Sequence, residues 1–143
     1  MQVYDTLDNV AVEMISNARN SGEISINNEG KKKLLLDVFQ ENNAGSVVTF
    51  GRNDSLNVVI GSGVNGSNGL ITVHDSLGRQ GILMTVDNNN DGEIIISSKG
   101  EQKVILDVFS ENNAGGMLLT GNNGTSNVIA GSAFEGSSGV VQV

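Results

Sequence analysis

Short apolar runs alternate with short polar stretches along the whole chain. Each run spans five or six residues, and the polar stretch after it is rich in Gly, Asn and Ser. A glycine opens a run at residues 22, 45, 69, 92, 115 and 139, and another apolar run lies midway between each pair. Short segments at such regular spacing are typical of an all-β protein. The pattern predicts twelve strand-turn units of about 12 residues each and a last partial strand.

Within several runs the apolar residues follow a period of two. Ile24 and Ile26 alternate with Glu23 and Ser25, which places the two pairs on opposite sides of a strand. The runs 34–39 and 104–109 are apolar on both sides, which is typical of strands buried on both faces. From the alternation we expect one set of side chains to point inward: Ile24, Ile26, Leu34, Leu36, Ile71, Val73, Ile82, Met84, Ile94, Ile96, Val104, Leu106, Val141 and Val143.

One segment, residues 10–16, leaves a helix open as an alternative. Ala11, Glu13 and Met14 favour a helix. The segment 80–86, which aligns with it, starts with Gln80-Gly81 and contains β-branched residues. We therefore expect both segments to be strands.

The chain repeats itself without a gap. Residues 1–73 match residues 71–143 at 30 of 73 positions, most densely over 37–45 and 107–115. The repeat predicts a single repetitive domain over 1–143, built from two tandem copies, 1–70 and 71–140. Both ends of the chain fall within the same strand of the repeat, so we expect a segment of a longer protein or a unit whose ends dock on other segments.

Composition narrows the classes of function. Aromatic residues make up 3% of the chain, and Trp, Cys and Pro are absent. The core must be aliphatic, disulfides and thiolate metal sites are ruled out, and the lack of Pro suits a continuous ladder of hydrogen bonds. The net charge of −8 argues against nucleic-acid binding. No apolar run is long enough for a membrane helix, and residues 1–5 show no signal peptide.

The turn at 87–93 contains a candidate calcium loop. Asp87, Asn89, Asp91 and the backbone at Glu93 fit the first part of the D-x-[DN]-x-[DN]-G pattern, which spaces oxygen ligands around a cation. Ser98 stands where the closing glutamate belongs, and the aligned residues 17–22 carry no carboxylate. We therefore expect a turn stabilised by its Asn and Asp side chains, with calcium binding as the alternative.

Acidic residues recur at equivalent positions of the two copies: Asp5/Asp75, Glu23/Glu93, Asp37/Asp107 and Glu41/Glu111. Pairs of carboxylates could serve glycoside hydrolysis, but a catalytic pair is normally unique in a chain. We expect Asp37 and Asp107 to accept turn amides or to pair with Lys33 and Lys103. The only histidine, His74, cannot by itself build a triad or a zinc site. We expect no catalytic residues and no cofactor.

Runs such as Gly69-Leu70-Ile71-Thr72-Val73, with Asn/Ser/Gly turns between them, give a texture that resembles the triple-stranded β-helix shafts of bacteriophage tail fibres and tailspikes. The resemblance covers the whole chain and implies an intertwined homotrimer whose three chains share one core. It also implies a virion tail protein, extracellular after assembly in the host cytoplasm. No catalytic residue of those enzymes can be carried over to a position here.

These observations predict a structural shaft segment of a phage fibre, or of a related contractile injection particle, that presents a host-attachment tip. Its partners would be two further copies, other segments of the same fibre, and host surface glycans in contact with its turns. A single-chain β-solenoid adhesin or surface-layer repeat is one alternative. A polysaccharide-degrading tailspike module with an active site between chains is the other.

Overall fold

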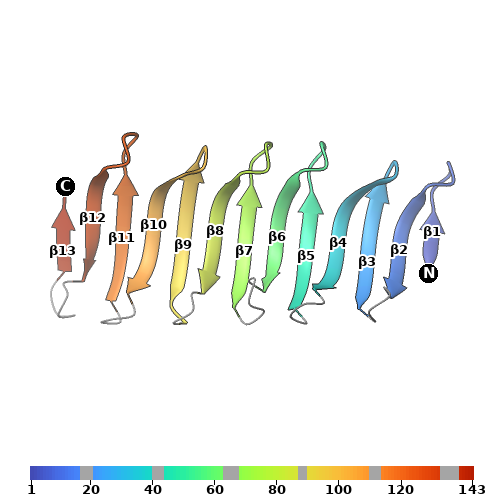
Figure 1. The fold of residues 1–143 in the computed structure, drawn as a ribbon, viewed down its shortest axis with the longest axis horizontal. Coiled ribbons are helices and arrows are strands. Elements are labelled where there is room, and N and C mark those ends of the chain that lie inside the picture. Colours follow the sequence, from blue (N-terminus) through green and yellow to red (C-terminus); the bar gives the residue numbers. More distant parts are fainter. Residues whose placement is uncertain (17–20, 40–43, 63–67, 87–89, 110–113, 133–138) are drawn as a thin grey trace.

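The computed structural model describes residues 1–16, 21–39, 44–62, 68–86, 90–109, 114–132 and 139–143. They form a single open sheet in which the strands follow one another in chain order (Figure 1). Every neighbouring pair is antiparallel, and β1 and β13 form the two ends of the sheet. The strands are β1 (Gln2–Tyr4), β2 (Val10–Ser16), β3 (Gly22–Asn28), β4 (Lys31–Phe39), β5 (Ala44–Phe50), β6 (Leu56–Ser62), β7 (Gly69–His74), β8 (Gln80–Val86), β9 (Gly92–Ser98), β10 (Glu101–Phe109), β11 (Ala114–Thr120), β12 (Ser126–Ser132) and β13 (Gly139–Gln142).

This arrangement confirms the predicted all-β, repetitive architecture. Each strand from β2 to β7 has a counterpart 70 residues later, from β8 to β13. Residues 10–16 are a strand, as expected, because Val12, Met14 and Ile15 pair in register with β3. The described part of the chain contains no helix that could cross a membrane.

The described turns lie along one edge of the sheet (Figure 1) and are of two kinds. Glu29-Gly30 and Lys99-Gly100 are two-residue turns with positive φ at both positions, as in type I′ hairpins. The four wider turns start at Asp5, Gly51, Asp75 and Gly121, and each closes with the same two backbone hydrogen bonds. Their fourth residue has a positive φ, which Asp supplies in two of them and Gly in the other two. The polar stretches between β4 and β5, between β6 and β7, and between β8 and β9 lie partly outside the described residues.

Register brings the predicted inward set together on one face of the sheet. A central row of this face crosses β2 to β13 through Met14, Ile24, Leu36, Val47, Ile60, Ile71, Met84, Ile94, Leu106, Met117, Ala130 and Val141. A parallel row nearer the described turns runs through Val3, Val12, Ile26, Leu34, Thr49, Val58, Val73, Ile82, Ile96, Val104, Leu119 and Val128.

A third row of the same face lies on the other side of the central row. Here Gly22, Gly45, Gly69, Gly92, Gly115 and Gly139 on the odd-numbered strands stand opposite Ser16, Val38, Ser62, Val86, Val108 and Ser132 on the even-numbered ones. None of the residues in these three rows is ionisable. We call them together the uncharged face, and the six glycines the glycine row.

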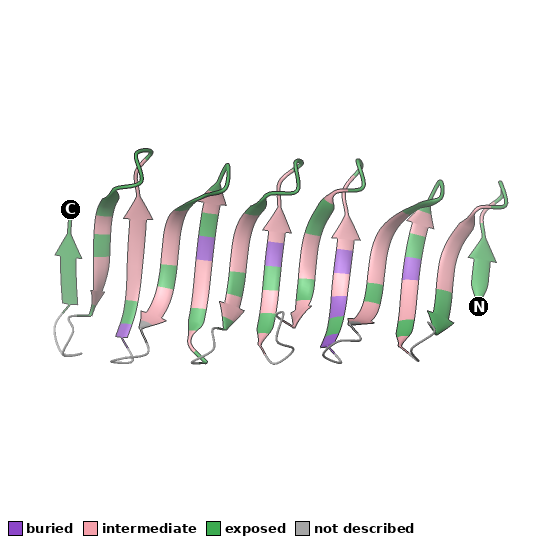
Figure 2. Cartoon of the chain, in the orientation of Figure 1, coloured by how far each residue is buried: buried purple, intermediate pink, exposed green. Residues whose placement is uncertain are grey.

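The burial predicted for the inward set is wrong for the single chain. Leu36 and Leu106 are 36% and 39% exposed, and Val141 and Val143 are 73% and 98% exposed. Four buried residues lie instead in the middle row of the opposite face: Ser25, Val48, Thr72 and Ile95 (Figure 2). Each sits on an odd-numbered strand between side chains of the two adjacent strands. The alternation therefore predicted which residues share a face but not which face the chain itself covers.

Candidate functional site

The uncharged face is an extended, partly exposed apolar surface. Ile26, Ile60, Ile71, Met84 and Ile96 all lie on it, and each is 38–46% exposed. Monomeric soluble proteins rarely expose contiguous apolar patches of more than a few hundred square ångströms. Aliphatic side chains in two adjacent rows across twelve strands exceed what an isolated chain can leave uncovered at low cost. The surface is therefore a candidate for interaction.

The total exposed surface leads to the same conclusion. The chain exposes 9428 Å², whereas a globular monomer of its 14.9 kDa mass exposes about 7,000 Å². The surplus of about 2,400 Å² arises because a single-layer sheet has no second layer to cover either face. A surplus of this size lies within the range that obligate protein interfaces bury.

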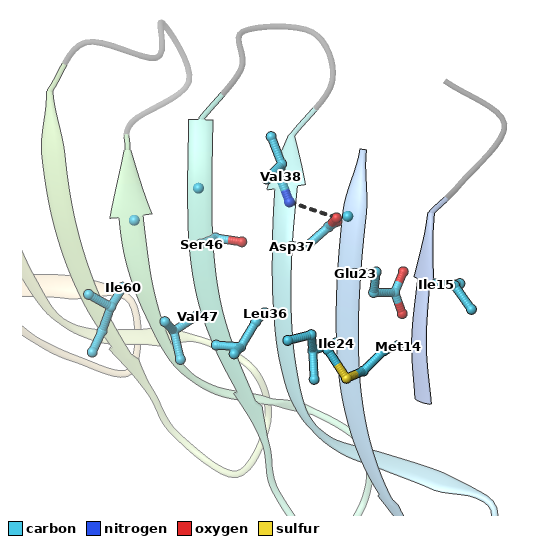
Figure 3. A pocket seen from close by; sticks show the side chains of 13 residues that line it. Met14, Ile15, Glu23, Ile24, Leu36, Asp37, Val38, Ser46, Val47 and Ile60 are labelled. Carbon is cyan, nitrogen blue, oxygen red and sulfur yellow. Dashed lines mark hydrogen bonds between the residues drawn. The ribbon is translucent and has the colours of Figure 1, made fainter. Parts of the chain in front are cut away.

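An open apolar groove of about 790 Å³ runs across β2 to β6 on the uncharged face. Its floor and one wall are the central-row residues Met14, Ile24, Leu36, Val47 and Ile60, which follow one another across the strands in Figure 3. The other wall belongs to the third row, with Gly22, Val38 and Gly45. Because glycine has no side chain, this wall is low at Gly22 and Gly45. The groove therefore offers contact area mainly for apolar groups, and the acids Glu23 and Asp37 of the opposite face also line it.

The glycine row has no explanation within the described part of the chain. A Cβ added at Gly22, Gly45, Gly69, Gly92 or Gly115 would meet nothing within 4 Å, and one at Gly139 only the Gly131 carbonyl at 3.9 Å. None of the six has a positive φ. Glycine inside a strand costs about 0.5–1 kcal/mol relative to alanine, because it loses more backbone freedom on folding. Neither conformation nor packing against the described residues offsets that cost here.

Other described glycines do have a local reason. A Cβ at Gly61 would lie 2.8 Å from the Gly45 carbonyl oxygen, and one at Gly131 would lie 3.0 Å from that of Gly115. These two glycines lie on the face opposite the uncharged face, where adjacent backbones approach closely. Gly78 and Gly124 have a positive φ in the wide turns. The glycine row thus differs from glycines that the sheet itself requires.

The opposite face carries the repeated acids of the strands. Glu23 stands directly across from Asp37, and Glu93 across from Asp107. The Nζ atom of Lys32 lies 2.6 Å from Glu23 Oε1, which offsets the repulsion between the first two carboxylates. Asp37 Oδ1 accepts a hydrogen bond from the backbone N–H of Val38 at 2.8 Å. Glu41 and Glu111 lie outside the described residues.

The predicted pairing of Asp37 and Asp107 with Lys33 and Lys103 is wrong. The Lys33 ammonium donates to the Gly51 carbonyl and to Asp54, at 3.1 Å each. Lys103 makes the equivalent bond to the Gly121 carbonyl at 3.1 Å and pairs with Glu101. Each lysine therefore connects its strand to the turn that follows the next strand.

The acids of the described turns act within those turns. Hydrogen bonds from the Asn9 side chain and from the backbone N–H groups of Asn9 and Leu7 lower the pKa of Asp5. The Arg79 side chain, at 2.7–2.8 Å, and the Arg79 backbone N–H lower the pKa of Asp75 in the equivalent turn. A hydrogen bond from Lys33 lowers the pKa of Asp54. These shifts favour ionised carboxylates that stabilise turns.

The candidate calcium loop is described only in part. Asp87 and Asn89 lie outside the described residues, Asp91 precedes β9, and Glu93 pairs across the sheet with Thr85 and Asp107. Within the described ranges, no three or more His, Cys, Asp and Glu side chains gather as a metal site would require. Calcium binding at this turn stays a prediction to be tested.

His74 has structural contacts on both ring nitrogens. Its Nδ1 lies 3.2 Å from the Gly78 carbonyl, which can only accept, and its Nε2 lies 2.9 Å from Thr72 Oγ1. In the tautomer that fits, Nδ1–H donates to Gly78 and Nε2 accepts from Thr72. The ring therefore ties its own turn to β7.

No family model and no curated protein sequence matches this chain. The candidate site therefore depends on the surface itself. Sequence reasoning identified the glycines by their steps of 23 and 24 residues but read them only as strand openings. Their spacing, combined with the period-two alternation of the runs they open, was the signal that they share one row.

Proposed function

We propose that the chain is a structural segment of a homotrimeric fibre, in which three copies wind as a triple-stranded β-helix around a shared apolar core. The class of fibre is that of bacteriophage tail fibres and tailspikes, or of a related contractile injection particle, where the segment holds a host-attachment tip away from the particle. The observation that carries the proposal is the single-layer sheet with an uncharged, aliphatic face and about 2,400 Å² of surplus exposed surface.

Energetics support a role in assembly. Repeat units that cannot bury an apolar face alone become stable by stacking on further units or chains. A net charge of −8 keeps such a chain soluble. With its charge excluded from one face, the chain can associate there without bringing carboxylates together.

The molecular mass in solution tests the proposal. Sedimentation equilibrium at micromolar concentration should give three times the 14.9 kDa chain mass, and electron micrographs should show slender rods. A species of 14.9 kDa at every concentration would overturn the trimer and favour a single-chain adhesin or surface-layer repeat.

Polysaccharide cleavage is the second candidate, because carboxylates face one another at Glu23/Asp37 and Glu93/Asp107. Retaining glycosidases place two carboxyl groups about 5–5.5 Å apart. The test is release of reducing ends from a panel of bacterial surface polysaccharides. Activity that disappears in Asp37→Asn and Asp107→Asn variants would support the enzyme, and absence of release from every polysaccharide would leave the structural role.

A further inference from the structure

We propose that the uncharged face is the surface on which copies of this chain pack against one another, with the glycine row as their line of closest approach. This inference rests on the proposed function, because it names the surface through which that assembly forms. The occupant is a second copy of the same chain. Three independent features of the face identify it.

The first feature is charge. Every copy carries a net charge of −8, so an interface between copies must keep carboxylates apart. The opposite face would bring the strand acids Glu23, Asp37, Glu93 and Asp107 toward the same residues of a partner. The three rows of the uncharged face contain no ionisable residue. Of the two faces, only this one is electrostatically compatible with itself.

The second feature is area. The surplus exposed surface is about 2,400 Å² per chain. In a ring of three, each chain has two neighbours, so the surplus divides into about 1,200 Å² per side and about 2,400 Å² per interface. Obligate homo-oligomers bury about 2,000 Å² or more at each interface. The surplus comes from both faces of the sheet, and it is large enough for two such contacts per chain.

The third feature is the glycine row. Glycine in a strand often marks a place where another backbone approaches closely. Side chains of ordinary size keep stacked sheets about 10 Å apart, and a row without side chains removes that spacer along one line. Among the described residues, nothing lies within 4 Å of an added Cβ at five of the six glycines, so no described part of the same chain makes this approach.

The spacing of the row favours a second copy over an unrelated partner. The six glycines lie on alternate strands, so they recur about every 9–10 Å across the sheet. A partner that uses all six must present matching groups with the same period over both repeats. Another copy of this sheet has the same period, because it has the same sequence and the same strand spacing.

Alanine and valine at the glycine row test the inference with opposite expectations. In the isolated chain, Gly45→Ala with Gly115→Ala should raise the melting temperature by a few degrees, because less backbone entropy is lost on folding. At an interface of closely approaching copies, the same double variant should shift the dissociation of the trimer to at least tenfold higher protein concentration. Gly45→Val with Gly115→Val should leave folded single chains.

Gly81→Ala is the matched control. It adds the same methyl group in β8, outside the glycine row, where a Cβ would make an ordinary 3.5 Å contact with the Val73 carbonyl. This variant should remain a trimer. Sedimentation velocity across a range of concentrations gives the mass of each variant, and far-UV circular dichroism gives its strand content.

A thiol probe covers the case in which a glycine variant does not fold. The chain has no cysteine, so Ser62→Cys, next to Gly69 in the same row, introduces a unique thiol. In the assembled protein this thiol should react with a maleimide at least tenfold more slowly than the thiol of Ser76→Cys, at an exposed position of a wide turn.

The outcomes separate the two proposals. A wild-type protein that is a single chain at all concentrations overturns both the trimer and this interface. A wild-type trimer whose glycine variants stay trimeric and melt at the same or a higher temperature overturns the interface alone. Equal labelling of the two thiols in the trimer does the same.

Discussion

Replacing Leu36 with alanine measures how much of the uncharged face is covered when the protein assembles. Leu36 lies in the central row between Ile24 and Val47 and is 36% exposed in the single chain. The change removes three carbon atoms, each worth about 0.8 kcal/mol when fully buried. Since about a third of the residue is already exposed, the single chain should lose about 1.5 kcal/mol of unfolding free energy.

In an assembly that covers the face, the same change should cost more. The exposed third of Leu36 becomes buried, and truncation leaves a cavity against the neighbouring chain. Leucine-to-alanine changes in closed cores cost about 2–5 kcal/mol, here in each chain. Leu106, at the same position of the second repeat and 39% exposed, should behave in the same way.

Val48→Ala is the matched control, because Val48 is 6% exposed on the opposite face. The change removes two methyl groups, which lowers the unfolding free energy by about 1.6 kcal/mol whether or not the chains assemble. Urea unfolding followed by circular dichroism at two protein concentrations a hundredfold apart distinguishes the sites. Leu36→Ala should lower the midpoint more at the higher concentration, and Val48→Ala should lower both equally. A Leu36→Ala shift that does not depend on concentration would refute the coverage of this face.

Three further predictions concern the turns. Hydrogen bonds from Arg79 lower the pKa of Asp75, so this carboxylate stabilises the fold above its unfolded pKa of about 3.9 and the contribution disappears as the pH falls through the folded pKa. Asp75→Asn should therefore reduce the drop in melting temperature between about pH 4 and pH 2, and an unchanged acid profile would contradict it. Gly78→Val should cost about 1–2 kcal/mol, because Gly78 has a φ of +77°. Gly78→Asp should cost clearly less in the same thermal melts, since Asp8 holds the equivalent position at +61°, and equal losses would disprove the role of φ. A chelator should leave the melting temperature unchanged in both the wild type and Asp91→Ala, whereas a saturating heat of one calcium per chain in calorimetric titration would establish the calcium loop.

The spacing of apolar and polar residues determined the strands and the turns of this protein. Period-two alternation requires no knowledge of the rest of the chain, because successive side chains of any strand point to opposite faces. It therefore grouped Ile24, Leu36 and Ile71 correctly on one face. The glycine steps likewise follow from strand and turn length alone. Both signals are local, and both were readable from the amino acids.

Tertiary structure decided which face is covered and which side chains meet. Burial depends on what lies above a face, and a single-layer sheet leaves Leu36 exposed while Val48 is enclosed by its neighbours on the opposite side. The partner of Lys33 also depended on geometry, because hairpin register brings its ammonium to the turn at Gly51 rather than to Asp37 in its own strand. Alternation along one strand holds no information about distances across several strands. Register and turn shape together set those distances, and they place the uncharged residues and the glycine row on one surface.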